Sequence, residues 1–334
     1  MLAIVCPGQG SQTPGFLTPW LDVADVAERL RWLGAVAGID LVAHSTTSDA
    51  DTIRDTAVAQ PLIVAAGLVA LPALLPGGGG PPDEAARVAD VVAGHSVGEL
   101  TAAALTGVLS PEQALVLVRE RGRAMAAASA VTPTGMSAVL GGNPDEVTAA
   151  IAEHGLTAAN LNAAGQVVAA GTLDQLAALA AAPPARARVV PLQVAGAFHT
   201  AHMAPAVDVL AGFARAITPG APRTRLLSNA DGAVVPTGGD ALRRIVDQVS
   251  NPVRWDACSA TLAELGVTGL LELPPAGTLA GLAKRALPGV EIVALKTPDD
   301  LPAARALVEK HATAAAGSLA VAASALTPAP GGTA

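Results

Sequence analysis

The chain has 334 residues, of which 51% are hydrophobic and 14% are charged, enough to bury a large core in roughly two domains and too apolar for disorder throughout. Aromatic residues make up only 2% and Tyr is missing, so the core must be aliphatic. The net charge of -8 argues against a nucleic-acid partner, which requires a basic surface. Two cysteines, Cys6 and Cys258, provide neither a disulfide framework nor a zinc knuckle and fit a reducing cytoplasm.

The first half of the chain predicts two buried strands, each followed by a loop. Short apolar runs at 2–6 and 88–93 predict the strands, and the second leads into an Ala-rich helix that ends near Gly107. The Gly- and Pro-rich segment 74–83 predicts a surface loop. Ser110-Pro111-Glu112-Gln113 predicts a capped helix start, with the helix continuing to about Ala128.

The segment 57–75 is long and apolar enough to resemble a membrane span. It contains Gln60, Pro61 and Pro72 and adjoins a run of glycines, so we predict a buried helix instead. The first residues show neither a charged start nor a cleavage site, which predicts no secretory signal. We therefore expect a soluble cytoplasmic protein that does not bind a membrane.

Residues 129–194 form a compact block with its own order of elements. The pattern predicts a strand at 136–140, a helix at 143–155, strands at 156–162 and 166–170, a helix from Thr172 and a strand at 188–194. That order, β-α-β-β-α-β, is typical of a ferredoxin-like unit. We predict that the block is a small subdomain inserted into a larger domain.

After the block, helices alternate again with strands. Helices are predicted at 204–217, 241–249, 255–265 and 279–286, and strands at 225–228 and 269–273. This alternation predicts a mainly parallel sheet covered by helices. Residues 312–334, rich in Ala, Pro and Thr, predict a disordered tail.

Gly94-x-Ser96-x-Gly98 stands between a predicted strand and a predicted helix. Glycines at these positions permit the tight turn of a nucleophile elbow, which lifts the serine hydroxyl above the sheet. The alternative is a plain Gly-rich turn with a capping serine. In elbow enzymes the residue after the nucleophile, here Val97, supplies one oxyanion N–H. The loop after the first strand makes Gln9 N–H the candidate for the second donor.

A nucleophilic serine needs a base, and His199 is the preferred candidate because it follows a predicted strand in a loop. His95 would point away from the serine, and His154 lies at a helix end. His199 and His202 have a metal-like spacing, but no carboxylate or thiolate stands near them, so we predict no metal. No acid sits at a strand end between Ser96 and His199. This disfavours an ordinary esterase and suggests that a backbone carbonyl orients the imidazole.

Arg121 lies on the apolar face of its predicted helix, in line with Val118 and Met125. A buried guanidinium needs a partner, and its planar fork suits a carboxylate. That carboxylate is either an internal Asp or Glu or part of a substrate. Arg119, Glu120 and Arg123 lie on other faces, which we expect to be solvated.

Several motifs together resemble the malonyl-CoA:acyl-carrier-protein transacylase family. They are Pro7-Gly8-Gln9-Gly10-Ser11-Gln12, Gly94-His95-Ser96-Val97-Gly98-Glu99, Arg121-Gly122 with Met125, Asn160-Leu161-Asn162 before Gly165-Gln166, Gly196-Ala197-Phe198-His199-Thr200, Gln248-Val249-Ser250-Asn251-Pro252-Val253 with Trp255, and Gly277-Thr278-Leu279. They follow family order over about residues 1–310.

The resemblance implies an α/β fold with a hydrolase-like core, 1–128 and 195–311, carrying a ferredoxin-like subdomain at 129–194. It implies that Ser96 receives the malonyl group, that His199 is the base and that the backbone carbonyl of Gln248 orients the imidazole. It further implies that Arg121 pairs with the malonyl carboxylate, and that Gln9 and Val97 form the oxyanion hole. Asn160 and Asn162 would lie on the acyl or pantetheine path, and Phe198 favours malonyl over methylmalonyl.

The expected substrates are malonyl-CoA and phosphopantetheinylated acyl carrier protein, with no further cofactor, and the protein is expected to be a monomer. Lys284 and Arg285 are candidates for a basic patch that docks the carrier. The alternatives are the malonyltransferase subunit of malonate decarboxylase, a serine thioesterase or hydrolase, and an inactive scaffold.

Overall fold

The first predicted strand, β1 (Leu2–Cys6), is the centre of a parallel sheet in the computed structural model, which describes residues 1–75, 88–163 and 165–313. In this sheet, sheet A, all four neighbouring pairs run parallel. The strand order is β10 (Glu291–Ala294), β9 (Gly269–Glu272), β1, β2 (Val91–Gly94) and β7 (Arg225–Leu226). The predicted parallel sheet is therefore confirmed. The loop with Gln9 follows β1 and the turn with Ser96 follows β2, so both leave the sheet from neighbouring strands.

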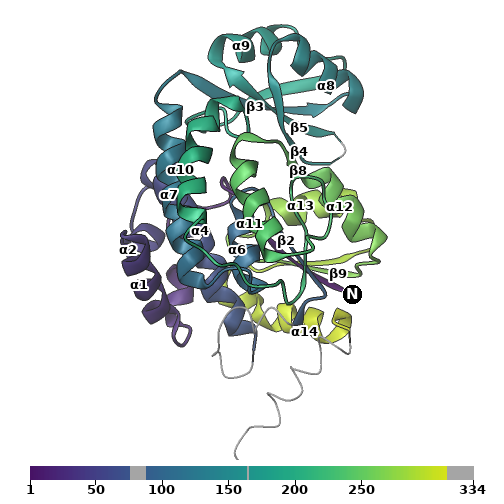
Figure 1. Ribbon diagram of the computed structural model, residues 1–334. Coiled ribbons are helices and arrows are strands. Elements are labelled where there is room, and N and C mark those ends of the chain that lie inside the picture. Colours follow the sequence, from purple (N-terminus) through teal and green to yellow (C-terminus); the bar gives the residue numbers. More distant parts are fainter. Residues whose placement is uncertain (76–87, 164, 314–334) are drawn as a thin grey trace, which may run out of the picture.

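Helices cover both faces of sheet A (Figure 1). Side chains of β1 alternate between two cores, because Leu2, Ile4 and Cys6 pack on one face while Ala3 and Val5 pack on the other. The first core is covered by α1 (Val26–Ala37), α4 (Thr56–Ala70), α6 (Gly98–Leu105), α7 (Pro111–Ser129), α11 (Gly238–Asp247) and α14 (Leu301–His311). The second is covered by α12 (Trp255–Glu264) and α13 (Thr278–Ala286). Three further helices belong to the part of the protein built around sheet A: α2 (Leu41–Thr46), α3 (Ala50–Arg54) and α10 (Ala204–Ala214).

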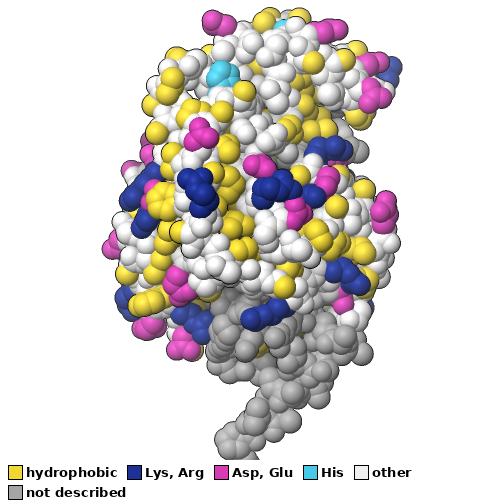
Figure 2. Space-filling view, in the orientation of Figure 1, with side chains coloured by type: hydrophobic (Ala, Val, Ile, Leu, Met, Phe, Trp, Pro, Cys, Tyr) yellow, Lys and Arg dark blue, Asp and Glu magenta, His cyan; other side chains and the backbone are white. Residues whose placement is uncertain are grey.

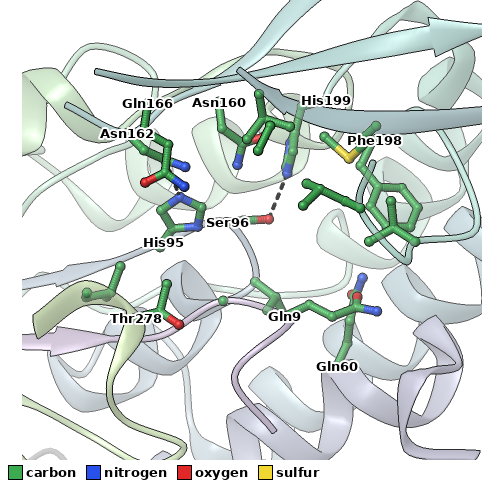
Figure 3. A pocket seen from close by; sticks show the side chains of 18 of the residues that line it. Gln9, Gln60, His95, Ser96, Asn160, Asn162, Gln166, Phe198, His199 and Thr278 are labelled. Carbon is green, nitrogen blue, oxygen red and sulfur yellow. Dashed lines mark hydrogen bonds between the residues drawn. The ribbon is translucent and has the colours of Figure 1, made fainter. Parts of the chain in front are cut away.

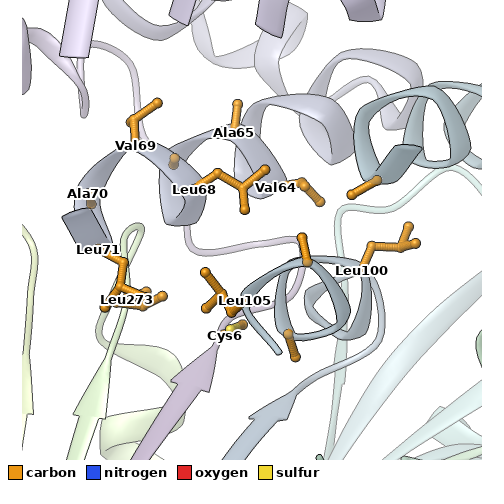
Figure 4. Packing of buried hydrophobic residues seen from close by; sticks show 14 of the residues in the cluster. Cys6, Val64, Ala65, Leu68, Val69, Ala70, Leu71, Leu100, Leu105 and Leu273 are labelled. Carbon is orange, nitrogen blue, oxygen red and sulfur yellow. The ribbon is translucent and has the colours of Figure 1, made fainter. Parts of the chain in front are cut away.

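The apolar segment that resembles a membrane span is a core helix. Thr56–Leu74 is long and apolar enough to cross a membrane, but 89% of its 18-residue window is buried inside the protein. It packs with α6 against sheet A, where aliphatic side chains such as Leu68 and Leu105 meet Cys6 and Leu273 (Figure 4). The predicted buried helix is thus confirmed.

A second sheet, sheet B, is mixed and lies beside the first part (Figure 1). Its order is β6 (Ala187–Pro191), β3 (Thr134–Gly141), β5 (Gln166–Thr172), β4 (Thr157–Leu161) and β8 (Val253–Arg254). Its first three pairs are antiparallel, whereas β4 and β8 are parallel. The helices α8 (Pro144–Glu153) and α9 (Leu173–Ala181) form a small separate core with it. Sheet B therefore takes its last strand from outside 129–194.

Several elements differ from the sequence-based expectation. Helices within 26–54, the strand β10 and the helix α14 were not predicted. The loop at 74–83 and the tail at 312–334 fall almost entirely outside the described residues. Glu120 was expected on a solvated face, but its side chain is 15% exposed because Arg119 and Arg123 both pair with it. On the face shown in Figure 2, Lys and Arg side chains lie among Asp and Glu rather than in one basic patch.

The turn between β2 and α6 depends on close backbone packing. A Cβ added at Gly98 would lie 2.2 Å from the backbone oxygen of Cys6, closer than any real contact. Replacing Gly98 with Ala must therefore push α6 away from β1 and should lower the free energy of unfolding by about 3 kcal/mol. Urea titration of the variant measures this loss.

Gly281→Ala in α13 is the matched control. Its added Cβ meets nothing within 4 Å, so the free energy of unfolding should stay the same or rise by about 0.5 kcal/mol. Equal stability of the two variants would show that the Gly98 contact is not tight.

Candidate active site

Ser96 stands at the tip of a sharp turn between β2 and α6. Its φ is 52°, a left-handed conformation that costs a non-glycine residue roughly 1–2 kcal/mol. A Cβ at Gly94 would lie 2.1 Å from the carbonyl of Gly98, so the turn closes only with glycine on both sides. The sequence pattern Gly94-x-Ser96-x-Gly98 therefore folds as a nucleophile elbow, with the serine hydroxyl held above the sheet edge.

The structure brings Ser96 and His199 together, although 103 positions separate them in the sequence. Ser96 Oγ lies 2.8 Å from His199 Nε2 (Figure 3). The other ring nitrogen, Nδ1, lies 2.9 Å from the backbone oxygen of Gln248, in the turn that follows α11. The carbonyl only accepts, so this shorter contact places the proton on Nδ1 and leaves Nε2 as the free acceptor; the side-chain Nε2 of Gln248 also lies 3.1 Å from Nδ1 but cannot accept that proton. This arrangement can take a proton from the serine without a triad carboxylate.

The buried imidazole of His199 is neutral. Burial and the positive charge of Arg121 lower the pKa of its imidazole from the usual 6.5 to about 3. The ring is therefore uncharged at neutral pH. The φ of His199, 63°, is also left-handed. Its backbone N–H donates to Val249 O, which ties the backbone of His199 to the 3₁₀ turn Gln248–Ser250.

This pKa predicts an unusual pH profile. The rate at which a fluorophosphonate labels Ser96 should stay level from pH 8 to pH 5, because the folded pKa lies below that window. A histidine at 6.5 would lose about 30-fold over the same range. Arg121→Gln removes one cause of the lowered pKa of His199, so the pH at which the labelling rate of this variant begins to fall should be higher than in the wild type. A wild-type midpoint near 6.5 would contradict the prediction.

Arg121 is buried beside Ser96. Its two terminal nitrogens donate to different partners: Nη1 to Gln60 Oε1 at 2.8 Å and Nη2 to Ser96 Oγ at 3.2 Å. Gly122 permits this, because α7 lies so close to α4 that a Cβ there would be 2.8 Å from Thr56 O. No carboxylate among the described residues forms a salt bridge with Arg121. Of the two partners expected from the sequence, an internal carboxylate within ion-pair distance is therefore not found.

Charges around the pocket leave it positive. Burial lowers the pKa of Arg121 to about 10, still far above neutrality, so the side chain stays a cation. The buried carboxyl of Glu99 has a pKa raised to about 8 by desolvation and is mostly protonated at pH 7. An anionic group that enters the pocket can neutralise Arg121, whereas an uncharged group leaves it unpaired.

Most other predicted site residues line one cavity of about 200 Å³. Gln9 lies on one side and Asn160 of β4 on the other (Figure 3), and Val97, Met125, Asn162 and Phe198 also line the cavity. Gln248 is absent from the lining because it lies behind His199. Among the described residues no backbone hydrogen bond uses the N–H of Gln9 or Val97 as donor, so both are available to an oxyanion.

The helix α13 forms a further part of the cavity wall. Both carboxyl oxygens of buried Glu272, at the end of β9, accept backbone N–H groups from the start of this helix, at 2.8–2.9 Å. That capping fixes the first turn of α13, whose Thr278, Leu279 and Leu282 face the cavity.

Two polar residues of the site, Gln60 and Asn229, were not predicted from the sequence. Gln60 is the one strongly polar side chain within an apolar helix, and that mismatch was a usable signal. Asn229 bonds to the elbow from the loop after β7, and no local pattern marks it. His95 Nε2 pairs with Asn162 Oδ1 at 2.8 Å, which explains why His95 points away from Ser96.

The metal alternative gains no support from the geometry. His202 is exposed on the turn after His199, while His199 faces Ser96. Within the described parts of the chain, no group of three His, Cys, Asp or Glu side chains is arranged to hold a metal ion.

Residues 3–304 match the model of the acyl transferase domain family. The chain belongs to the acyl transferase family. The malonyl CoA-acyl carrier protein transacylase of Mycobacterium tuberculosis is 50% identical over 307 residues, 90% of this chain and 98% of that protein. That identity places the chain among the malonyl CoA-acyl carrier protein transacylases within the family.

Solved structures agree with this placement. The crystal structure of MCAT from Mycobacterium tuberculosis superposes with a TM-score of 0.83 and 49% identity, covering 90% of this chain and 98% of that one. A type II PKS acyl-carrier protein in complex with its malonyl-transacylase gives a TM-score of 0.82 and 31% identity, covering 91% of this chain and 99% of that chain. The acyl transferase fold of this chain is thus shared over nearly its whole described length.

Proposed function

We propose that this protein transfers the malonyl group from malonyl-CoA to the phosphopantetheine thiol of acyl carrier protein through a malonyl ester on Ser96. One observation carries the proposal: Arg121, a buried cation that forms no ion pair with any described residue, donates to the same hydroxyl oxygen that faces the neutral His199. Nucleophile, base and carboxylate receptor thus share one cavity. The names of the transacylase relatives, malonyl CoA-acyl carrier protein transacylase, support the same substrates.

In the first half-reaction Ser96 Oγ attacks the thioester carbonyl, and its proton passes to His199 Nε2. The tetrahedral oxyanion accepts from the N–H groups of Gln9 and Val97, and loss of one such donor typically costs ~10²–10³ in rate. The C–S bond then breaks, and His199 returns its proton to the departing coenzyme A thiolate. The malonyl ester on Ser96 remains.

In the second half-reaction the carrier's thiol replaces coenzyme A. His199 takes the thiol proton, the sulfur attacks the ester carbonyl, and the C–O bond to Ser96 breaks while His199 returns the proton to Oγ. The carbonyl of Gln248 stabilises the imidazolium in both halves. Because the first product leaves before the second substrate binds, the kinetics are ping-pong.

Arg121 is the proposed receptor for the malonyl carboxylate. A bidentate pair would replace its present bonds to Gln60 and Ser96, so the carboxylate frees the nucleophile from the cation. Met125, Phe198, Asn160 and Asn162 line the space for the acyl group and the pantetheine arm, and Phe198 restricts branching next to the carboxylate.

The wider assignments belong to the same proposal. We infer a hydrolase-like core, 1–128 and 195–311, with a ferredoxin-like subdomain at 129–194, supported by the strand order β6-β3-β5-β4. The product supplies extender units for fatty acid synthesis or for a polyketide carrier. We infer a cytoplasmic monomer that binds neither nucleic acid nor membrane and needs no cofactor or metal, since the two half-reactions balance with the residues named. Exposed Lys284 and Arg285, at the end of α13, are candidates for contacts with an acidic carrier.

Intact-protein mass spectrometry tests the proposal. Wild-type protein mixed with malonyl-CoA should gain one malonyl group, and added holo-carrier protein should remove it. Ser96→Ala should gain nothing.

Other results would point to the alternatives. Release of coenzyme A and free malonate without transfer would indicate a hydrolase, and neither adduct nor release would indicate a scaffold. Discharge only to the carrier of a malonate decarboxylase would indicate that enzyme's malonyltransferase subunit.

A further inference from the structure

Asn229 lies in the loop after β7, far from Ser96 in the sequence and in direct contact with it in the fold. It is fully buried. Its side-chain Oδ1 accepts from Ser96 N at 2.7 Å, and its Nδ2 donates to Gly94 O at 2.7 Å. One amide group therefore holds both arms of the nucleophile elbow, on either side of His95.

These two bonds continue the parallel ladder of sheet A. The pairing of β2 with β7 sets Val92 opposite Leu226, and Leu227 N donates to Val92 O. Counted onward in that register, position 229 stands opposite His95. A strand residue there would donate to Gly94 O and accept from Ser96 N. The backbone has already turned away, and the side-chain amide makes the same two bonds in its place.

Asn229 is itself fixed by its surroundings. Its N–H donates to Glu99 Oε1 at 2.8 Å, and its C=O accepts from Arg254 N at 2.8 Å. Glu99 belongs to the first turn of α6, directly after the elbow. The backbone of Asn229 is thus bound through its N–H to α6, the helix that follows Ser96, and through its C=O to β8.

We propose that Asn229 is the positioning residue of the nucleophile, holding Ser96 in its left-handed conformation so that Oγ meets His199 and Val97 N–H faces the oxyanion. Ser96 N–H has no helical partner at this turn, and a serine released from the amide can relax toward an ordinary backbone conformation. Such a rotation moves Oγ and the following N–H together. A displacement of about 1 Å at the reacting atoms can cost ~10²-fold in rate.

Asn229→Ala tests this inference, which rests on the proposed function only in taking Ser96 as the nucleophile. We expect kcat for malonyl transfer to fall ~10²-fold with KM for malonyl-CoA unchanged. Labelling of Ser96 by a fluorophosphonate should slow by the same factor. That second readout does not depend on the natural substrate, so it separates a failure of this inference from a failure of the proposed transferase activity.

Asn143→Ala is the matched control. The Asn143 side chain also accepts backbone N–H groups, from Asp145 and Glu146 at the start of α8, but it lies outside the site. It should lower the melting temperature without changing kcat or the labelling rate. If folded Asn229→Ala keeps the wild-type kcat, the inference is wrong. It is also wrong if the variant loses activity only because a smaller fraction of its molecules is active, each at the wild-type rate.

Asn229→Asp adds a pH readout and keeps the shape of the side chain. The acid keeps the acceptor for Ser96 N–H, but it can donate to Gly94 O only when protonated. Its activity should therefore rise as the pH falls from 7 to 5, while the wild type stays level. The titratable neighbours of Asn229 are Glu99 and Cys258. Burial raises the pKa of Glu99 to about 8 and raises the pKa of the Cys258 thiol further, so the comparison is made below pH 7, where the thiol is neutral and Glu99 is mostly protonated. A level profile in Asn229→Asp would overturn the proposed role.

Discussion

Replacing Arg121 with Ala should lower malonyl transfer by about 10³-fold and leave acetyl transfer unchanged or faster. Breaking a buried ion pair from one side costs roughly 3–5 kcal/mol, and each ~1.4 kcal/mol is tenfold in rate. Acetyl has no carboxylate and cannot pair with the guanidinium, so it loses nothing when the cation is removed. The measurement is kcat/KM for both acyl-CoA substrates with the same carrier protein.

Arg119→Ala is the control on the same helix. Arg119 binds Glu120 and Val36 O on another face of α7, so both acyl groups should be transferred at the wild-type rate. Equal losses of malonyl and acetyl transfer in Arg121→Ala would mean that Arg121 supports the pocket without recognising the carboxylate.

Replacing His199 with Ala should lower the rate of Ser96 acylation by on the order of 10⁵-fold. The two side chains act as one unit, and removal of the base from such a unit costs nearly as much as removal of the nucleophile. No other imidazole can take over, because the nearby His95 is held by Asn162 at 2.8 Å. The pre-steady-state release of coenzyme A measures the acylation step directly.

His202→Ala, three residues further on and exposed, should acylate at the wild-type rate. If His199→Ala retained a burst within tenfold of the wild type, another group would have to be the base.

Local sequence patterns predicted the part of the site that lies on single turns. The strand-turn-helix around Ser96, the apolar face that carries Arg121 and the loop at Gln9 are each readable within about ten residues. The pairing of His199 with Gln248 came from the family resemblance. Gln60 was marked as unusual by its polarity within an apolar helix, but its partner and that of Asn229 could not be predicted, because those partners lie 61 and 133 positions away.

The fold shows the same division. Periodicity predicted most helices and strands, including the order of elements along 129–194. The short helices α2 and α3 and the strand β10 were missed because their apolar patterns are brief and only partly buried. The longer helices α1 and α14 were also missed, although each buries apolar side chains at helical spacing. The parallel pairing of β4 with β8 depends on two segments about 95 residues apart, and only the assembled structure brings Asn160 opposite Val253.

The pairing of β4 with β8 limits how far the acyl chamber, the cavity of about 200 Å³ beside Ser96, can widen. Strand β8 is hydrogen-bonded into sheet B, and its Arg254 N–H also binds Asn229 O beside sheet A. The part of the chamber wall on the side of sheet A and the part on the side of sheet B are therefore joined by one hydrogen-bonded backbone segment. They cannot swing apart to admit a bulkier extender unit without breaking main-chain bonds next to the nucleophile. A variant selected for larger acyl groups should therefore change the side chains that fill the chamber, with Phe198 and Met125 first, and leave the spacing of the two sheets as it is.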